Sequence, residues 1–286
     1  MDLHGYLALW CAVFGTVAVV GYGRSLAGVT KAQRAVRVMG RIEEVREPRH
    51  GSSQRDGIPV VVTFRDPSSG EEFTVTNDTG HGESITTAWV GREIGIRYPR
   101  GRPHAYRFVH DLAEGRRGLG WPSFAVFLIY VGLVVFAAID WAWPWALIGS
   151  GGPLAIVTAL YLPQVAPVAN RRIDALTSRP PVPGRVIAVL SDTSTDSEGF
   201  TSTSHTPVIA FTTHEGTAVT AYCPDGLPNH AKSYGRDVTI HYTPDDPAVL
   251  TTDLAAEHRS RTHEITFSVV ALLLGTAAVV VGAVLL

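Results

Sequence analysis

The sequence contains only two cysteines, Cys11 and Cys223, among 286 residues. Cys11 falls inside a long apolar stretch and Cys223 in a region of mixed polarity, and neither has a counterpart in the internal repeat described below. A disulfide-stabilised fold requires a set of cysteines that can pair. The sequence therefore excludes a disulfide framework.

Charge is also scarce, because Asp, Glu, Lys and Arg make up 17% of the chain and the mean hydropathy is positive. This composition is unusual for a soluble protein of this size and indicates a membrane protein. Four apolar stretches account for it: 6–22, 121–143, 145–162 and 265–286. A helix crosses the hydrocarbon core with about 20 apolar residues. We therefore predict four transmembrane helices.

An internal repeat divides the remainder of the chain. The segment GREIGIRYPRGRP, which begins at Gly91, recurs 144 residues later as GRDVTIHYTPDDP, which begins at Gly235. The same interval links Gly40-Arg41-Ile42 to Gly184-Arg185-Val186. A repeat of this length indicates two copies of one domain, which we call the first copy and the second copy.

Each copy has the pattern of a small β domain. Ile94, Ile96 and Tyr98 alternate with polar or small residues, which is typical of a half-buried strand, and the second copy repeats this alternation. The run 60–64 is rich in β-branched residues and predicts a buried strand. With an opening strand, a strand near Phe73 and a closing strand, each copy has about five strands. This number predicts a small β-barrel or a curled sheet.

The predicted fold class is therefore a membrane α-helical plus all-β protein, in which four transmembrane helices carry two repeated, small, five-stranded β-barrel-like domains. Two equivalent domains lie most simply on one side of the membrane, which requires an even number of crossings between them. The third apolar stretch is short and contains Gly151-Gly152-Pro153, so a re-entrant or interfacial segment is its alternative. The predicted divisions are 1–23 (first helix with a short tail), 24–118 (first β domain), 119–163 (a hairpin of helices two and three), 164–264 (second β domain) and 265–286 (fourth helix).

Positive charge is distributed asymmetrically about these helices. Lys and Arg flank them on the side of the β domains, whereas the tail MDLHG, the Trp-rich hairpin tip 140–145 and the C-terminus contain none. The positive-inside rule places the basic side in the cytoplasm. We therefore expect a multi-pass protein of the cell membrane with cytoplasmic β domains and extracytoplasmic N- and C-termini. The basic segment 29–38 either prolongs the first helix as a collar against anionic headgroups or is a solvated helix end.

The repeated motif resembles a widespread family of small bacterial membrane proteins built on a domain of unknown function. The resemblance implies a small all-β domain flanked by transmembrane helices, here in two tandem copies, and it implies no activity. The first copy departs from the motif at Arg100-Gly101-Arg102, where the second has Pro244-Asp245-Asp246. The positions that carry the resemblance are Gly40, Pro59, Phe64, Gly91, Tyr98 and Pro103 in the first copy and Gly184, Pro207, Phe211, Gly235, Tyr242 and Pro247 in the second.

No pattern in the chain predicts a metal site. A zinc site needs closely spaced ligands such as CxxC or HExxH, together with partner ligands. The most closely spaced histidines lack such partners, and the two copies disagree at the equivalent positions. These histidine pairs are His104 with His110, His205 with His214, and His258 with His263.

Catalytic signatures are equally scarce. The loop residues Asp78, His81, Glu83 and Ser84 have the composition of a hydrolase site, but no Gly-x-Ser-x-Gly elbow surrounds Ser84. The glycine-rich segment 149–152 lies in an apolar stretch and lacks the lysine of a phosphate-binding loop. We therefore predict no catalytic, cofactor-binding or metal-binding residue, no cofactor and no enzymatic activity. A net charge of −2 also argues against nucleic-acid binding.

The sequence is most consistent with a non-enzymatic, membrane-anchored scaffold or protein-interaction module. The alternative is an accessory or regulatory subunit of a membrane enzyme or protease complex. The expected partners are the lipid bilayer and an unidentified protein, and the small residues of the last apolar stretch also allow homo-oligomers. We expect the polar loops Asn77–Thr87 and Ser191–His205 to form the contact surface, and the second of them to be mobile because it is rich in Ser and Thr.

Overall fold

The computed structural model describes residues 3–77, 82–110, 112, 119–196, 198–223 and 226–286. The chain separates into two compact units. A helical unit comprises residues 1–34, 113–170 and 260–286, and a β unit comprises residues 35–112 and 171–259. Both copies of the repeat thus contribute their strands to the same β unit.

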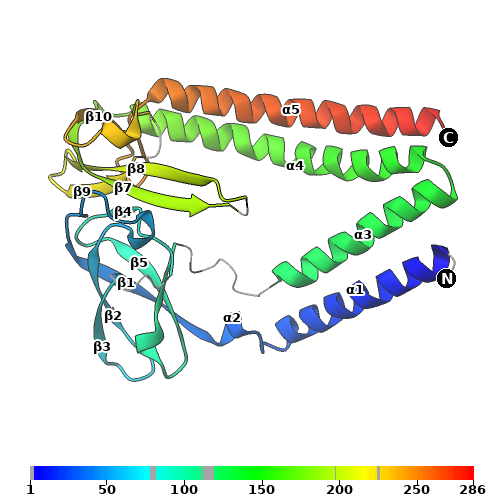
Figure 1. The fold of residues 1–286 in the computed structure, drawn as a ribbon, viewed down its shortest axis with the longest axis horizontal. Coiled ribbons are helices and arrows are strands. Elements are labelled where there is room, and N and C mark those ends of the chain that lie inside the picture. The colour runs from blue at the N-terminus through cyan, green and yellow to red at the C-terminus, as the bar shows by residue number, and fades with distance from the viewer. Residues whose placement is uncertain (1–2, 78–81, 111, 113–118, 197, 224–225) are drawn as a thin grey trace. The chain divides into compact units, whose positions relative to one another are not determined.

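Four long helices account for the four apolar stretches (Figure 1). They are α1 (Leu3–Leu26), α3 (Gly120–Asp140), α4 (Pro144–Thr177) and α5 (Leu254–Val284). Each is long and apolar enough to cross a membrane. α4 runs without interruption through Gly151, Gly152 and Pro153, although its sequence suggested a break there.

Small residues allow the helices of this unit to approach closely. A Cβ atom at Gly132 of α3 would lie 2.8 Å from the ring of Trp10, whose indole Nε1–H donates to the carbonyl of Leu128 at 2.9 Å. On α4, a Cβ atom at Gly151 would lie 2.7 Å from the carbonyl oxygen of Gly275 on α5. Van der Waals packing at small residues is the usual basis of helix association in membranes.

The helices of this unit are antiparallel in two pairs. At the start of α1, His4 lies 3.9 Å from Asp140 at the end of α3. At the end of α5, Gly282 lies against the carbonyl of Pro144 at the start of α4. The beginning of α1, the α3–α4 connection and the end of α5 therefore lie at the same end of the helical unit, as Figure 1 shows.

The chain does not continue the first helix into the basic segment 29–38. α1 ends at Leu26, a four-residue helix α2 (Lys31–Arg34) follows, and the first strand starts at Ala35. The expectation of a helical collar is therefore wrong. Val36 and Val38 explain the difference, because they lie on either side of Arg37, point to the same face of a strand and pack against the core of the β unit.

The first sheet has the strand order β3-β2-β1-β5-β6, and all neighbours are antiparallel. The predicted strands at 60–64 and 94–98 are confirmed as β2 and β5. No ladder joins the edge strands β3 and β6 in the part of the chain that the structure describes. The strands are β1 (Ala35–Val45), β2 (Val60–Arg65), β3 (Glu72–Thr76), β5 (Glu93–Pro99) and β6 (Arg107–Val109), with the short 3-10 helices η1 (Gln54–Asp56) and η2 (Pro103–Ala105) between them.

The second sheet has the order β11-β10-β7-β8-β9-β4. Its five strands from the second copy are ordered as their counterparts are in the first sheet. The sixth strand, β4, comes from the first copy. The strands are β7 (Val182–Thr195), β8 (Thr201–Thr212), β9 (Ala218–Tyr222), β10 (Asp237–Tyr242), β11 (Leu250–Thr251) and β4 (Thr87–Ala88), and η3 (His230–Lys232) is a 3-10 helix.

β4 joins the two sheets by strand addition. Thr87 pairs with Ala221 and Ala88 with Thr220, so a segment of the first copy extends the edge of the second sheet. The hydrophobic core is also shared, because Leu190 and Val208 of the second copy belong to the cluster that contains Ile42 of the first. Each copy alone is small and buries a modest core. Their joint core explains why they form one unit.

Candidate interaction surfaces

The segment 191–205, which we expected to be a mobile loop, is a β-ribbon. β7 and β8 remain paired from Ser191 and His205 to Thr195 and Thr201. The hydroxyl groups of Thr193 and Thr203 lie 3.4 Å apart, and those of Thr195 and Thr201 also lie 3.4 Å apart. Threonine is β-branched and favours strands, and cross-strand threonine pairs stabilise sheets. The Ser/Thr content therefore indicated a strand pair rather than disorder.

Asp196 makes hydrogen bonds at the tip of the ribbon, next to an exposed aromatic ring. The carboxylate of Asp196 accepts hydrogen bonds from the backbone N–H groups of Glu198 and Phe200, both at 2.9 Å. Gly199 has φ +86°, which favours glycine. Phe200 follows with 72% of its side chain exposed. Exposed aromatic side chains are enriched at protein interfaces, so Phe200 is a candidate contact residue.

The ribbon also offers unpaired backbone. β10 pairs with β7 only at residues 182–185, and β9 pairs with β8 only at residues 208–212. Ser191 still forms a bridge with Ser53 of the first copy, and Arg55 lies 3.6 Å from Asp192. Beyond Asp192, neither strand of the ribbon has a second neighbour in the described residues. Two free strand edges therefore lie next to the exposed phenylalanine.

The other expected contact loop, Asn77–Thr87, lies partly outside the described residues, since 78–81 are not among them. Its ends are structural. The Asn77 side chain accepts from the backbone N–H of Val60 at 2.8 Å and donates to the carbonyls of Asp56 and Ile58. Thr87 lies in β4. The described part of this loop therefore serves the fold of the β unit.

The structure does not bring the suggested hydrolase residues together. Asp78 and His81 lie outside the described residues. Glu83 contacts His110, with its carboxylate 2.6 Å from the His110 backbone nitrogen and 2.5 Å from ring Nδ1, and these bonds lower the pKa of Glu83. The Ser84 hydroxyl donates to the carbonyl of Arg55 at 3.2 Å. Ser84 has no base beside it among the described residues, so it lacks the geometry of a nucleophile.

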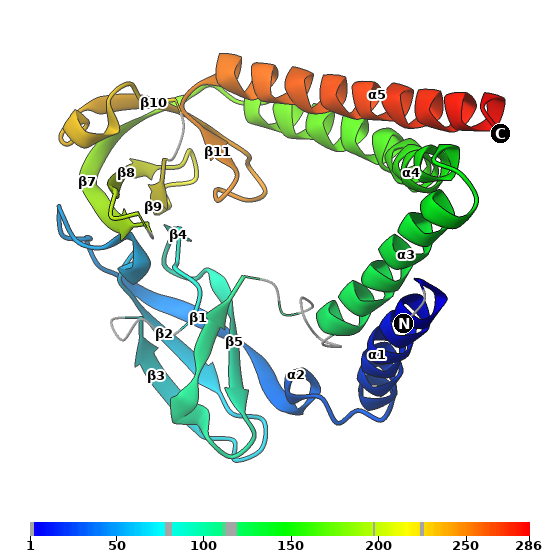
Figure 2. The same ribbon diagram turned by 45° about the vertical axis from the view of Figure 1, so that its right-hand side comes forward.

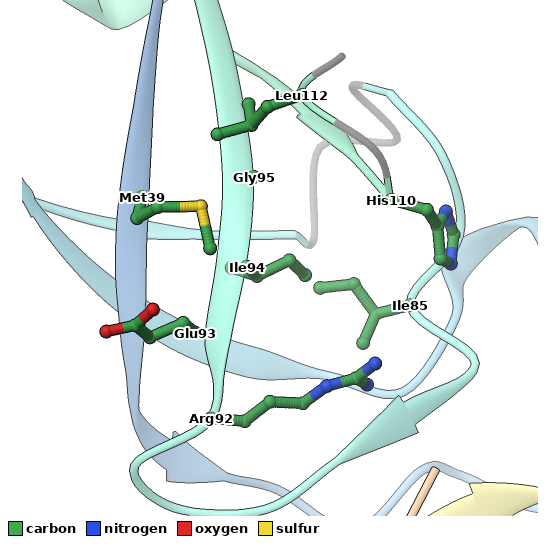
Figure 3. A pocket seen from close by; sticks show the side chains of 8 residues that line it. All are labelled: Met39, Ile85, Arg92, Glu93, Ile94, Gly95, His110 and Leu112. Atoms are coloured by element: carbon green, nitrogen blue, oxygen red, sulfur yellow. The ribbon is translucent and has the colours of Figure 1, made fainter. Parts of the chain in front are cut away.

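A hollow of ≈ 290 Å³ lies at the edge of β5, beyond the end of β6 (Figure 3). Ile85, Ile94 and Leu112 form apolar walls, and Arg92 and His110 supply polar groups. This volume is at the lower limit of small-molecule sites, which measure about 300–1,000 Å³. Among the residues that the structure describes, the lining contains no Ser, Thr, Cys, Lys or Asp.

Arg92 in this hollow has a structural task. Its guanidinium lies over the Trp89 ring, 4.8 Å from the centroid, and donates from Nη1 to the carbonyl of Thr87 in β4. Burial lowers the pKa of Arg92, while the negative charge of Asp246 in the second copy opposes that shift. Arg92 thus holds the β4–β5 connection against the second sheet, and the hollow is a packing defect beside it rather than a built site.

Acidic side chains in the turn after β2 and its counterpart after β8 hold a tyrosine in each copy. Tyr98 donates to the Asp66 carboxylate at 2.7 Å, and Tyr242 donates to Glu215 at 3.4 Å. The Tyr98 hydroxyl and that of Ser68 hold the pKa of Asp66 well below its usual range. Hydrogen bonding to Arg179 lowers the pKa of Glu215 to about 2. These clusters anchor turns, because the acidic side chains are engaged by the tyrosines, by residues of the turns and, for Glu215, by Arg179 of the segment between α4 and β7.

The histidines are dispersed over the fold. The ring of His104 packs against Phe73, His205 pairs in register with Ser191, and His258 and His263 lie on α5. Within the described residues, no group of three or more His, Cys, Asp or Glu side chains is placed to hold a metal ion.

Comparison of the chain with protein-family models, with curated proteins and with solved structures finds no match. The candidate surfaces therefore rest on the geometry of this chain alone. The contact role expected for segment 191–205 stays a prediction, whereas its strand conformation and the strand β4 were not predicted. The alternation of Thr with Ser in residues 193–195 and 201–204 was the available signal for the ribbon.

Proposed function

We propose that this chain is a membrane-anchored protein-interaction module without enzymatic activity. In this proposal α1, α3, α4 and α5 cross the membrane, and the two copies of the repeat form one β unit on its cytoplasmic side. The close helix contacts at glycine and the common end shared by the start of α1, the α3–α4 connection and the end of α5 support an even number of crossings. The absence of Lys and Arg from that end supports the orientation.

The two-copy arrangement and the relation to small bacterial membrane proteins of unknown function are part of the same proposal. The shared strand order of the two sheets supports two copies of one β module. Such modules would be small alone and would gain stability by joining their cores.

The observation that carries the interaction function is the ribbon of residues 191–205. It extends beyond the strands that flank it, offers two unpaired edges and ends in Phe200, which is 72% exposed. A protein partner would add a strand to one edge and cover the phenylalanine ring. The molecule already uses this mode internally, because β4 extends the edge at β9.

The test is site-specific crosslinking in cells. A photo-crosslinking residue placed at Thr203 should capture a discrete partner, and Phe200→Ser should reduce that crosslink about tenfold, since an exposed aromatic anchor contributes about 1–2 kcal/mol or more to an interface. Val90→Ser is the matched control, because Val90 is also exposed, at 60%, but lies on the β4–β5 connection. Crosslinks to lipid alone, or a partner captured equally by the Phe200→Ser variant, would refute the role of the ribbon.

Topology requires a separate measurement. A single cysteine at Thr195, in a variant without Cys11 and Cys223, should react with a membrane-impermeant maleimide only after cell lysis. Labelling of intact cells would reverse the orientation and move the search for a partner to the cell envelope.

A further inference from the structure

The first sheet carries a row of arginines across three adjacent strands. Arg37 of β1 pairs in register with Arg97 of β5, and Arg97 pairs with Arg107 of β6. Residues directly opposite one another have side chains on the same face. Val38, Ile96 and Phe108 occupy the next row and pack in or against the core. The three arginines therefore lie on the outer face of the sheet, and β1 and β5 are seen side by side in Figure 2.

This row is unfavourable by itself. Neighbouring strands are about 4.8 Å apart, so the Cα atoms of the three arginines span about 10 Å. Like charges directly opposite one another destabilise a sheet. Arg37 donates from Nη1 to the carbonyl of Leu112, whereas neither Arg97 nor Arg107 lies within 4.0 Å of a carboxylate of the described residues. Arg97 and Arg107 thus carry positive charge that no carboxylate of the described residues neutralises.

Further arginines extend the positive charge around the same end of the sheet. Arg100 and Arg102 lie in the connection that follows β5, Arg34 directly precedes β1, and Arg65 ends β2. All four are exposed and none forms an ion pair with a described residue. We call this set the arginine surface; its members are Arg34, Arg37, Arg65, Arg97, Arg100, Arg102 and Arg107.

The second copy has the same strand order but none of this charge. At the positions equivalent to Arg97, Arg100, Arg102 and Arg107 it has His241, Pro244, Asp246 and Thr251. The fold of the repeat therefore does not require the arginines, and the second sheet is an internal control for them. A function confined to the first copy explains the difference better than a structural role does.

We propose that the arginine surface binds the phosphate headgroups of anionic phospholipids. Guanidinium groups match phosphate oxygens in geometry and charge. Only eight residues, 27–34, separate the end of α1 from the start of β1, so the chain tethers this end of the sheet close to any membrane that α1 crosses. The inference rests on the proposed membrane anchoring. It adds a lipid site that would fix one face of the first sheet at the bilayer and leave the ribbon of the second copy for a protein partner.

Arginine-selective modification with phenylglyoxal tests this proposal on the full-length protein. The protein is placed in nanodiscs of phosphatidylcholine alone or of phosphatidylcholine mixed with phosphatidylglycerol, and each site is quantified by mass spectrometry. We expect modification of Arg97, Arg100 and Arg107 to slow by about fivefold or more in the anionic discs, because each basic side chain near an anionic surface is attracted by about that factor. Arg236, an exposed arginine of the second copy, should react equally in both.

The variant R97Q/R107Q leaves Arg100 as a reporter and should abolish most of its protection, whereas R236Q should not. Equal reactivity of Arg97, Arg100 and Arg107 in the two kinds of disc would overturn the proposal. So would equal protection of Arg236, which would indicate a non-specific effect of the anionic surface. Protection by inorganic phosphate in phosphatidylcholine discs would assign the surface to a soluble anion, and protection only by a copurifying acidic protein would assign it to a protein partner; either result overturns the lipid assignment.

Failure of the membrane proposal would be recognised separately, because the protein would then not enter either kind of disc. A chain that enters the discs, shows the expected cysteine labelling and yet shows no lipid-dependent protection would retain its anchoring and lose only the lipid site.

Discussion

Asn77 follows the edge strand β3. Its side chain makes hydrogen bonds to backbone groups for which the sheet provides no partner strand. It is 6% exposed and makes three hydrogen bonds, to the backbone of Val60, Asp56 and Ile58. Asparagine can satisfy both a donor and an acceptor in this way. A buried backbone group without a hydrogen-bond partner lowers the free energy of unfolding. Asn77 therefore holds the end of β3 against the segment 56–60.

Replacement of Asn77 by Ala should therefore lower the free energy of unfolding by about 3 kcal/mol, because the buried backbone groups of Val60 and Ile58 and the partly buried carbonyl of Asp56 lose their partner. The measurement is the midpoint of urea unfolding of the solubilised full-length protein. Thr74→Ala, on the exposed face of β3, is the control and should change stability by less than about 0.5 kcal/mol. An equally small effect of Asn77→Ala would mean that water replaces the side chain.

The contact between Glu215 and Arg179 should make stability depend on pH in the acid range. The pKa of Glu215 falls to about 2 through its contact with Arg179, from an ordinary value near 4.5. A carboxyl group whose pKa is lower in the folded state stabilises the protein above the unfolded pKa, and this contribution is lost as the pH falls from about 4.5 towards 2. Glu215→Gln should thus flatten stability in that window, and unfolding measured at pH 6 and pH 3 tests it. An unchanged difference between the two pH values would contradict the role of this contact.

At the scale of the elements, α4 and α5 approach at glycine. A Cβ atom at Gly151 would lie 2.7 Å from the Gly275 carbonyl oxygen and 2.8 Å from the Cβ of Ala278, whereas one at Gly152 would meet nothing within 4 Å. Backbone cannot yield as a flexible side chain can. Gly151→Leu should therefore destabilise the helical unit by about 1–3 kcal/mol, and Gly152→Leu should leave it nearly unchanged. Thermal unfolding in detergent distinguishes these neighbouring substitutions, and equal effects would show that the helices do not pack as described.

The elements also show what the sequence could predict. Hydropathy located all four long helices, a run of β-branched residues located β2, and alternation located β5, because burial on one face leaves a period in the sequence. β4 left no such signal, since it is two residues long and pairs with a strand more than 130 residues away. The arginine row was equally hidden. Arg37, Arg97 and Arg107 become neighbours only through the register of three strands, which sequence spacing does not reveal.

The ribbon was missed for a different reason. Its Ser, Thr and Asp residues match the composition of a disordered segment, but composition does not record which residues face each other. Pairing of Thr193 with Thr203 and of Thr195 with Thr201 converts the same residues into a cross-strand ladder. The paired strands pass through the core at Val189 and Val208 and continue into the polar segment. The strand pairing that is set in the core therefore outweighs the polar composition of this segment.

At the scale of the molecule, the β unit joins two copies of about equal size through a hydrophobic cluster to which both contribute. Leu190 and Val208 of the second copy belong to the cluster around Ile42. Phe211 and Ile240 belong to a second cluster whose buried members all come from the second copy, and Trp89 of the first copy packs against it. β4 and the backbone hydrogen bond from Ser191 to Ser52 add two further links between the copies. Elements that share a core in this way are expected to unfold together.

Phe211→Ala tests this cooperativity without touching the shared cluster. Phe211 is 5% exposed and its ring lies 5.7 Å from that of Tyr242, so its removal should cost about 3–4 kcal/mol. If the β unit is one cooperative structure, the slowest-exchanging amides of Val62 and Ile96 in the first sheet should lose as much protection as those of Ile209 and Ile240 in the second. Native-state hydrogen exchange measures both sets in one sample, and Val90→Ser should alter neither. A loss of protection confined to the second sheet would show two independently stable domains. Strand addition by β4 would then be a contact between two separately folded domains.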